Sequence, residues 1–413
     1  MNMLKTNPIF HMKIFYNTLP FLSAAAILLS ASCGSLRAQS MESIDSVLAA
    51  VERNNLELRA LQQNNEASRL EIQSQNNLQQ DISVSYSPFF TRGYDGVASS
   101  ELVVSMGFDF PSQYISRGKS GKLQNEALDM QYALQRRDIL LQAQLLCLDL
   151  VRINQEKELL DTRMANADEL LTLMEKRFAE GGANIIEVNK VKMERMNVRT
   201  LAAQNEAARQ NALQSLRAMN GNIPVELLAA EYPAASDIVD YDEFYAEVMA
   251  TDAGILSAEA SVDAAAQEIK VNRQNWLPKF EVGYRRNTAM TEASHGFLVG
   301  ASLPLFSSRN KTKIAEARHT AAQSELENAR LQAETQLQSR YNELQQIRSA
   351  VQTYDVPLMH STLDALKSAV LAGQMSVIDY YVEADNVYGN LSTYLSLENQ
   401  YRKLLAEAYR NRL

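Results

Sequence analysis

Two hydrophobic periods alternate along the chain, one typical of helices and one typical of strands. Helical spacing holds over about residues 43–79. It gives way to a period of two in residues 81–90 ("DISVSYSPFF") and again in residues 101–111 ("ELVVSMGFDFP"). Each of these stretches has one apolar face and one polar or small face, which predicts two strands separated by a loop.

A long helical pattern follows the second strand. It spans about residues 117–178, which corresponds to a rod on the order of 90 Å long at the usual rise per residue. Gly181 and Gly182 interrupt the pattern, and a second helix is expected over residues 184–219, where Asn220 and Gly221 form a stop signal. Rods of this length are typical of coiled coils rather than of ordinary globular cores.

The second half of the chain repeats this order of elements. A helix ("FYAEVMATDAGILSAEASVDAAAQEIKVN") leads to two alternating stretches ("PKFEVGYRR" and "GFLVGASLPLF"), then to a helix over about residues 312–371 and a last helix over about 377–411. Pro357 is expected to kink or break the long helix. We therefore divide the chain into a first repeat at 39–221, a link at 222–240 and a second repeat at 241–413.

The turns between the long helices carry the clearest repeat signal. Gly181 and Gly373 stand 192 residues apart in the sequence. The same offset relates three further pairs, Ile185 with Val377, Ile186 with Ile378, and Glu187 with Asp379. Both glycines are expected to reverse the chain, because glycine adopts a positive φ at little cost.

Residues 1–38 have the pattern of a signal peptide. Lys5 and Lys13 precede an apolar stretch that is too short to span a bilayer. Cleavage after Ala38 and lipidation at Cys33 are the two alternatives for its processing. No later apolar run reaches 18 residues, so no membrane-spanning helix is expected, and Cys147 lies on an apolar helix face with no disulfide partner in the mature chain.

Composition and motifs exclude several classes of function. A net charge of −9 argues against a general nucleic-acid binder. The sequence has no phosphate-binding glycine loop, serine elbow or supported pair of carboxylates, so we predict no enzymatic activity and no cofactor. The spacing of His295, His319 and His360 does not favour a metal site. Met193 and Met196 favour gap-filling in the core over a metal relay.

The four predicted strands cannot form a pore within one chain. Four strands are too few to enclose a lumen, and an open sheet edge cannot face lipid with unsatisfied backbone groups. Closure therefore requires further copies, and three copies would supply twelve strands. The alternative is an ordinary half-buried sheet in a soluble protein.

The order and spacing of these elements resemble the TolC-type outer-membrane efflux channel family, also called outer membrane factors, over about Ser40 to the C-terminus. The segments that carry the resemblance are "ERNNLELRAL", "NWLPKFEVGY", "GASLPLFSSRNKTKIAEA", "FAEGGANIIEV" and "LAGQMSVIDYY". The resemblance implies a mainly α-helical fold with a small β-barrel part. It implies a homotrimer with a twelve-stranded barrel in the bacterial outer membrane and a coiled-coil tunnel of helices across the periplasm.

The resemblance also implies partners and a function. The chain would act as the passive outer-membrane channel of a tripartite efflux system, together with a periplasmic membrane-fusion adaptor protein and an inner-membrane pump of the RND type, and it would contact outer-membrane lipid. The alternatives are a periplasmic coiled-coil scaffold without a pore and an exit duct for type I polypeptide secretion. Nothing in the sequence distinguishes drugs, metal ions or polypeptides as the exported substrate.

The resemblance assigns roles to the turns between the long helices. Gly181, Gly182, Gly373 and Gln374 would form the periplasmic tips that contact the adaptor. Glu187 and Asp379 are expected either to cap the returning helices or to line the closed aperture. Met375 occupies a position where relatives can place a basic residue that locks the tip. Tyr380 and Tyr381 are interpreted either as an aromatic gate or as packed core residues.

Overall fold

The computed structural model describes residues 39–41, 43–76, 81–234, 237–238, 240–289, 292–304 and 310–413. The chain divides into two compact units, Met1–Arg37 and Ala38–Leu413, and the described residues all belong to the second. The expected signal peptide, with the cleavage site after Ala38 and the lipidation site at Cys33, lies outside the described residues.

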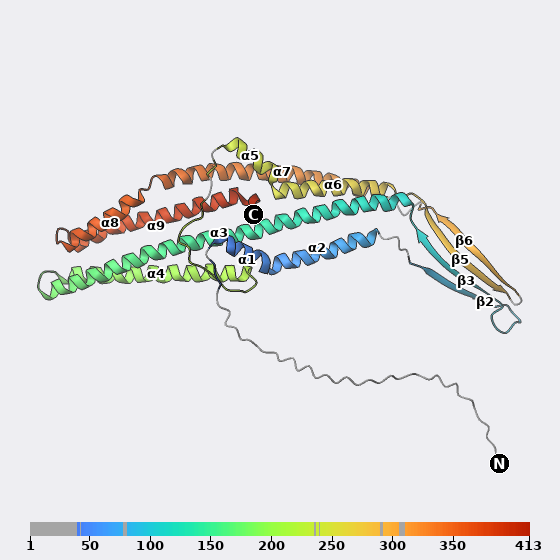
Figure 1. The fold of residues 1–413 in the computed structure, drawn as a ribbon, viewed down its shortest axis with the longest axis horizontal. Coiled ribbons are helices and arrows are strands. Elements are labelled where there is room, and N and C mark those ends of the chain that lie inside the picture. The colour runs from blue at the N-terminus through green and yellow to red at the C-terminus, as the bar shows by residue number, and fades with distance from the viewer. Residues whose placement is uncertain are drawn as a thin grey trace, which may run out of the picture. The chain divides into compact units, whose positions relative to one another are not determined.

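The described part of the chain is mainly helical, as predicted (Figure 1). The helices are α1 (Ile44–Asn54), α2 (Leu56–Gln75), α3 (Pro111–Ala179), α4 (Ile185–Met219), α5 (Tyr241–Thr251), α6 (Ala253–Arg273), α7 (Lys311–Gln352), α8 (Val356–Leu371) and α9 (Val377–Ala408), with a final 3-10 turn at Arg410–Arg412. With 69 residues, α3 is on the order of 100 Å long.

Four antiparallel strands form one open sheet. They are β2 (Ser83–Phe89), β3 (Ser99–Phe108), β5 (Lys279–Ala289) and β6 (Ala293–Ser302), in the order β2-β3-β5-β6. Each repeat contributes one hairpin, and the β3-β5 pairing joins the two repeats. The predicted strands are confirmed, although β6 begins before the expected residue 296 and residues 305–309 lie outside the described residues. A separate parallel pair joins β1 (Gln39–Met41) to β4 (Val225–Leu227).

The helices that adjoin the sheet pack in the same order as its strands. α2 contacts α3, α3 contacts α6, and α6 contacts α7. Along the chain, α2 precedes β2, α3 follows β3, α6 precedes β5 and α7 follows β6 (Figure 1). Farther along the chain, α3 packs against α4 and α9, and α8 packs against α9. The two halves of the chain therefore show the same order of packed helices and strands.

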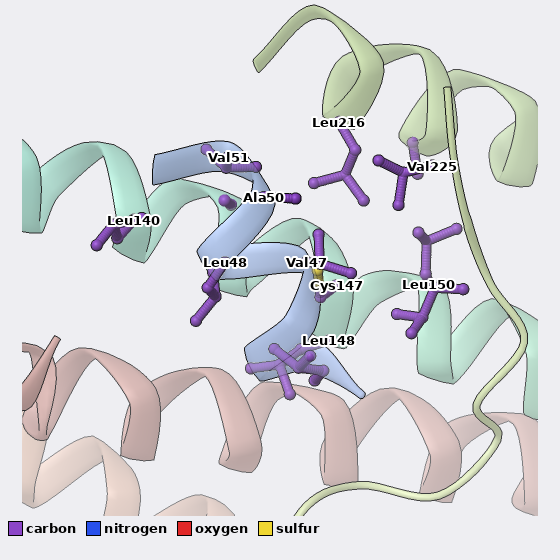
Figure 2. Packing of buried hydrophobic residues seen from close by; sticks show 14 of the residues in the cluster. Val47, Leu48, Ala50, Val51, Leu140, Cys147, Leu148, Leu150, Leu216 and Val225 are labelled. Carbon is purple, nitrogen blue, oxygen red and sulfur yellow. The ribbon is translucent and has the colours of Figure 1, made fainter. Parts of the chain in front are cut away.

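A hydrophobic cluster binds α1 to the middle of α3 and to the end of α4. Figure 2 shows Val47 and Val51 of α1 close to Cys147 of α3, Leu216 of α4 and Val225 of β4. The thiol of Cys147, which the sequence places on an apolar helix face, is buried, and burial raises its pKa to about 12. Because the reactive thiolate is then scarce at neutral pH, this cysteine has a structural role.

Helical breaks at Asn55 and Asp252 correct the prediction of two continuous helices. The two residues have nearly the same backbone angles, φ −63° with ψ 124° and φ −63° with ψ 117°. Asn55 accepts a hydrogen bond from the N–H of Leu58 at 2.9 Å, and Asp252 accepts one from the N–H of Gly254 at 2.9 Å. Each residue thus starts a new helix as its N-cap, although the hydrophobic periodicity runs through the break.

The structure corrects one predicted bound of the long helices and confirms one predicted break. α3 begins at Pro111, earlier than the expected residue 117, because proline suits the first turn of a helix. The break that Pro357 predicts is confirmed between α7 and α8. Asp355 caps α8 by accepting a hydrogen bond from the N–H of Leu358 at 2.9 Å.

Candidate functional site

The turns after α3 and α8, called the tip turns here, have the same backbone geometry. Gly181 has a φ of +77° and Gly373 a φ of +72°. In the first turn, the N–H of Gly181 donates to the carbonyl of Phe178 at 3.0 Å and that of Gly182 donates to Arg177 at 2.7 Å. This pair of bonds, with glycine in the left-handed region, is a Schellman motif.

The second tip turn reproduces that motif. The N–H of Gly373 donates to the carbonyl of Val370 at 3.0 Å, and that of Gln374 donates to Ala369 at 2.9 Å. Gln374 therefore takes the place of Gly182, and Gly182 is not among the residues with positive φ. Glycine is required at Gly181 and Gly373 but not at Gly182.

Glu187 and Asp379 both belong to helix caps. The side chain of Asn184 accepts from the N–H of Glu187 at 3.0 Å, and Glu187 accepts from the N–H of Asn184 at 2.8 Å. In the second repeat, the hydroxyl of Ser376 accepts from the N–H of Asp379 at 3.1 Å and donates to its carboxylate at 2.7 Å. The capping role expected of these carboxylates is present, while their role at an aperture remains a prediction.

The tyrosines considered for a gate lie in a hydrophobic core. Tyr380 and Tyr381 are only 1% and 4% exposed, and their rings meet edge to face at 4.9 Å. They pack with residues of α3, α4 and α8, and Met375 lies half-buried against the same cluster. Burial raises the pKa of both phenols. Gating by Tyr380 or Met375 therefore stays a prediction, and in this structure both residues contribute to packing.

Arg177 connects the two tip turns. Its guanidinium donates to the carbonyl of Leu371, the last residue of α8, at 3.2 Å. Carbonyl groups at the end of a helix lack partners within the helix and carry a partial negative charge, so a cation is favourable there. Arg177 thus stabilises both turns as a pair.

A half-buried arginine joins the helices α3, α4 and α9. Arg163 of α3 donates to the carboxylate of Glu194 on α4 at 2.7 Å and also pairs with Asp385 on α9. Glu194 is only 5% exposed. The guanidinium also lies over the ring of Tyr388, 4.6 Å from its centre. The sequence analysis did not find this cluster, because its members are far apart in the chain and each looks like an ordinary charge on a helix.

Lys367 extends these contacts to α8. Its ammonium group donates to the side chain of Asn166 at 2.8 Å and pairs with Glu169 at 2.7 Å. Asn166 in turn donates to the hydroxyl of Tyr388 at 3.2 Å. The α8-α9 pair is thereby connected to α3 by polar contacts as well as by the hydrophobic cluster.

The sheet has one continuous apolar face. Residues directly opposite each other in an antiparallel sheet point to the same face. The register groups its members as Val84 with Val104, Val104 with Tyr284, Tyr284 with Phe297, Met106 with Val282, Val282 with Val299, and Phe108 with Phe280. Phe297 is 92% exposed and Val299 is 81% exposed. No described element covers this face.

The other face of the sheet is mainly small and polar. It includes Ser85, Ser105 and Gly283, and an ion pair between Glu101 and Arg285 lies across β3 and β5. At the base of the sheet, Asp109 pairs with Arg117 and with Lys279, the latter at 3.2 Å. One face thus suits an apolar medium and the other suits water.

The described residues also lack two features that sequence motifs can indicate, a metal cluster and a membrane-spanning helix. Within them, no group of three or more His, Cys, Asp or Glu side chains is placed to hold a metal ion. Among the helices of these residues, none has the length and apolar content needed to cross a bilayer.

Residues 245–407, most of the second repeat, match the model of a family described as outer membrane efflux protein. The predicted resemblance to outer membrane efflux proteins is confirmed. No curated protein sequence matches the chain.

Solved structures extend the resemblance to both repeats. A membrane protein from Pseudomonas aeruginosa matches with a TM-score of 0.72 at 16% identity, covering 89% of this chain and 89% of that one. CusC, whose structures concern folding and transmembrane channel formation, matches with a TM-score of 0.70 at 14% identity over 89% of this chain and 91% of its own. The outer membrane protein VceC from Vibrio cholerae matches with a TM-score of 0.69 at 15% identity over 89% and 95%. At these identities the matches establish the fold of outer membrane efflux proteins.

Proposed function

We propose that the protein is the outer-membrane channel of a tripartite efflux system, located in the bacterial outer membrane and extending into the periplasm. The observation that carries the proposal is the open sheet with an exposed, continuous apolar face. A surface of this kind is unfavourable in water, but it is what a strand presents to lipid. The opposite, polar face would line an aqueous path.

The sheet edges support assembly into a homotrimer. β2 and β6 are the edge strands, and each has one side without a partner strand in the sheet. In lipid, every backbone N–H and carbonyl group needs a hydrogen-bond partner, so each edge must pair with a strand of another copy. Three copies of a four-stranded sheet would give a closed barrel of twelve strands, within the range of known outer-membrane barrels.

The helices support the same mode of assembly. α2 and α7 are the outermost of the four helices that adjoin the sheet, as β2 and β6 are of the strands. Their exposed apolar residues include Leu56 and Leu70 on α2 and Leu331 on α7. Contact between α2 of one copy and α7 of the next would cover these residues and continue the barrel as a tunnel of helices.

The tip turns support docking of a periplasmic adaptor protein. Several large apolar side chains near them are exposed, namely Phe178, Ile185, Ile186, Ile378 and Val382. Met193 and Met196 are also exposed, at 63% and 62%, which corrects their assignment to the core. We propose that the adaptor and an RND-type inner-membrane pump dock here, and that separating the helix pairs opens an aperture lined by Glu187 and Asp379.

Two alternative functions differ in the surroundings that they imply for the apolar face of the sheet. A coiled-coil scaffold without a pore would leave Phe297 and its neighbours in water. An exit duct for type I polypeptide secretion would use the same trimer with a different pump, so the exported substrate follows from the partner rather than from this fold. We propose no enzymatic activity.

A combined fractionation and conductance experiment tests the function. We expect the full-length protein in the outer-membrane fraction as a heat-modifiable trimer that forms small, stable channels in planar bilayers. Phe297→Glu, which places a charge on the apolar face, should weaken membrane insertion, because a charged side chain on the lipid face of a strand is unfavourable. A soluble wild-type protein that forms no channels would refute the proposal in favour of the scaffold.

A further inference from the structure

A row of four residues crosses the apolar face of the sheet near the strand ends that are remote from the helices. The register places Tyr86 opposite Leu102, Leu102 opposite Arg286, and Arg286 opposite His295. The next row toward the helices consists of Val84, Val104, Tyr284 and Phe297. A basic pair therefore lies directly beside the apolar band and on the same face.

Arg286 differs from its neighbour Arg285 in its partners. Arg285 projects to the polar face and pairs with Glu101. The guanidinium of Arg286 has no ion-pair or hydrogen-bond partner among the described side chains, and the residue is exposed. An arginine on an apolar face without a carboxylate partner calls for an anion from outside the chain.

His295 is held in place by Tyr284, which belongs to the neighbouring apolar row. Its Nδ1 is hydrogen-bonded to the hydroxyl of Tyr284, and the two rings are stacked with their centres 6.0 Å apart. The Nε2 atom is the ring nitrogen that this contact leaves for another partner. Directly opposed side chains in an antiparallel sheet have Cβ atoms about 5 Å apart, so one tetrahedral anion can contact both Arg286 and His295.

We propose that Arg286 and His295 bind a phosphate group of an outer-leaflet lipid. The inference rests on the proposed function, which places this face in lipid and this end of the sheet at the outer surface. The planar guanidinium matches the geometry of a phosphate group and bonds to it through two parallel N–H groups. Binding would fix the depth of the barrel in the membrane.

The position of Arg286 in the sheet favours a lipid phosphate over a dissolved phosphate ion. Arg286 lies three residues before the end of β5 at Ala289, or roughly 10 Å along the strand. This is a suitable depth for a headgroup, with the acyl chains lying against Tyr284 and Phe297. A dissolved phosphate ion would gain nothing from the adjoining apolar band.

Lipid retention by the purified full-length trimer tests the proposal. Native mass spectrometry would count bound molecules of diphosphoryl lipid A, a phosphorylated glycolipid, and of its dephosphorylated form. Wild-type protein should retain the phosphorylated form about tenfold better, as expected for charge-assisted hydrogen bonds. Arg286→Gln with His295→Gln should lose this preference, and the matched control Arg285→Gln on the opposite face should keep it.

A competition experiment and a single-residue variant distinguish the ways in which the lipid proposal could be wrong. Inorganic phosphate added to the lipid-loaded protein should not displace the lipid, and complete displacement at a concentration equal to that of the lipid would overturn the assignment to lipid. Equal retention of both lipid forms by the wild type, or a preference that survives in the double variant, would also overturn it. If the double variant does not assemble, Arg286→Gln alone, at an exposed position, replaces it in the comparison.

Flotation with phosphatidylcholine vesicles distinguishes this proposal from the proposed function. Wild-type protein that does not float with vesicles lacks membrane insertion, which refutes both. Protein that floats but shows no phosphate preference is compatible with the proposed function and refutes the lipid site alone.

Discussion

Gly181 and Gly373 end α3 and α8 in the same left-handed conformation, with φ of +77° and +72°. The two turns have matching hydrogen bonds from the N–H groups of Gly182 and Gln374 to carbonyls five residues earlier in the chain. The helices that follow each turn begin with a capping side chain, Asn184 or Ser376. The tip turns are therefore two copies of one turn-and-cap unit.

Replacement of Gly181 by alanine should destabilise the first tip turn. A Cβ atom there would meet nothing within 4 Å, so the cost comes from the left-handed backbone and is about 1–2 kcal/mol. Hydrogen exchange of the amides of Gly182 and of the first turn of α4 would measure the local opening free energy.

Gly182→Ala is the matched control for that variant. Gly182 has no positive φ, and an added Cβ would lie 3.6 Å from the carbonyl oxygen of Arg177, an ordinary contact. We expect no loss of opening free energy, because replacing glycine at a compatible position also lowers the entropy of the unfolded chain. Equal losses in both variants would contradict the assignment of the Schellman glycine to Gly181.

The sequence was sufficient to predict features that depend on local pattern. Strand alternation, the paired glycine turns and the break at Pro357 each follow from neighbouring residues. The breaks at Asn55 and Asp252 were missed because the apolar spacing continues through them. Their signal was a capping residue inside a helical pattern, which periodicity alone does not separate from an exposed polar position.

The polar contacts between helices were beyond prediction from one sequence. Arg163 of α3 pairs with Glu194 of α4 and with Asp385 of α9. Nothing local distinguishes these residues from unpaired surface charges, because their contacts depend on how α3, α4 and α9 pack. The burial of Tyr380, for which a gate was the alternative, depends on the same packing.

Loss of the Arg163 side chain should be strongly destabilising. Arg163→Met would leave Glu194, only 5% exposed, without its partner, and the expected loss is about 3–5 kcal/mol. Guanidinium unfolding followed by circular dichroism in detergent would measure it. Arg163→Met combined with Glu194→Gln should recover much of the loss, because no unpaired charge is then buried.

Asp385 provides the contrasting control. Its side chain is 43% exposed, so water can replace the arginine when the pair is broken. Asp385→Asn should cost no more than about 1 kcal/mol. A loss from Asp385→Asn as large as that from Arg163→Met would show that the exposed pair, and not burial of Glu194, determines the stability of the cluster.

Asp252 should make stability depend on pH below its ordinary pKa of 3.8. Burial alone would raise this pKa, but Arg410, the N–H of Ile255 and Arg137 together lower it. A carboxyl group with a lowered pKa in the folded state stabilises the fold above the unfolded value and loses this effect as pH falls through the folded value. The contribution should therefore be complete near neutral pH and decline below about pH 4.

Asp252→Asn tests this sign. The amide oxygen can still cap α6, so the variant loses mainly the charge. It should melt at a lower temperature than the wild type at pH 7, and the difference should narrow as pH falls below 3.8. Glu247→Gln, in a pair with Arg412 that is about half exposed, should change the melting temperature little. A difference for Asp252→Asn that stays constant down to pH 2 would contradict the assignment.

The capping bonds of Glu187 and Asp379 determine how an aperture role must be tested. Alanine at these positions would remove both the charge and the hydrogen bond to Asn184 or Ser376, so a change in conductance would have two explanations. Glu187→Gln with Asp379→Asn removes the charge and keeps an oxygen that can accept the same bond. Comparing the conductance of the Ala/Ala and Gln/Asn double variants separates the effect of the lost charge from the effect of the lost capping bonds.

If the carboxylates line the aperture, the Gln/Asn variant should lose cation preference in planar bilayers while its conductance rises little. Three copies of each carboxylate, six in all, would attract cations in a narrow pore, and neutral side chains of the same size do not. If the carboxylates act only as caps, the Gln/Asn variant should match the wild type, and Glu187→Ala with Asp379→Ala alone should show a larger or noisier conductance. Unchanged conductance and selectivity in both variants would place the constriction at other residues.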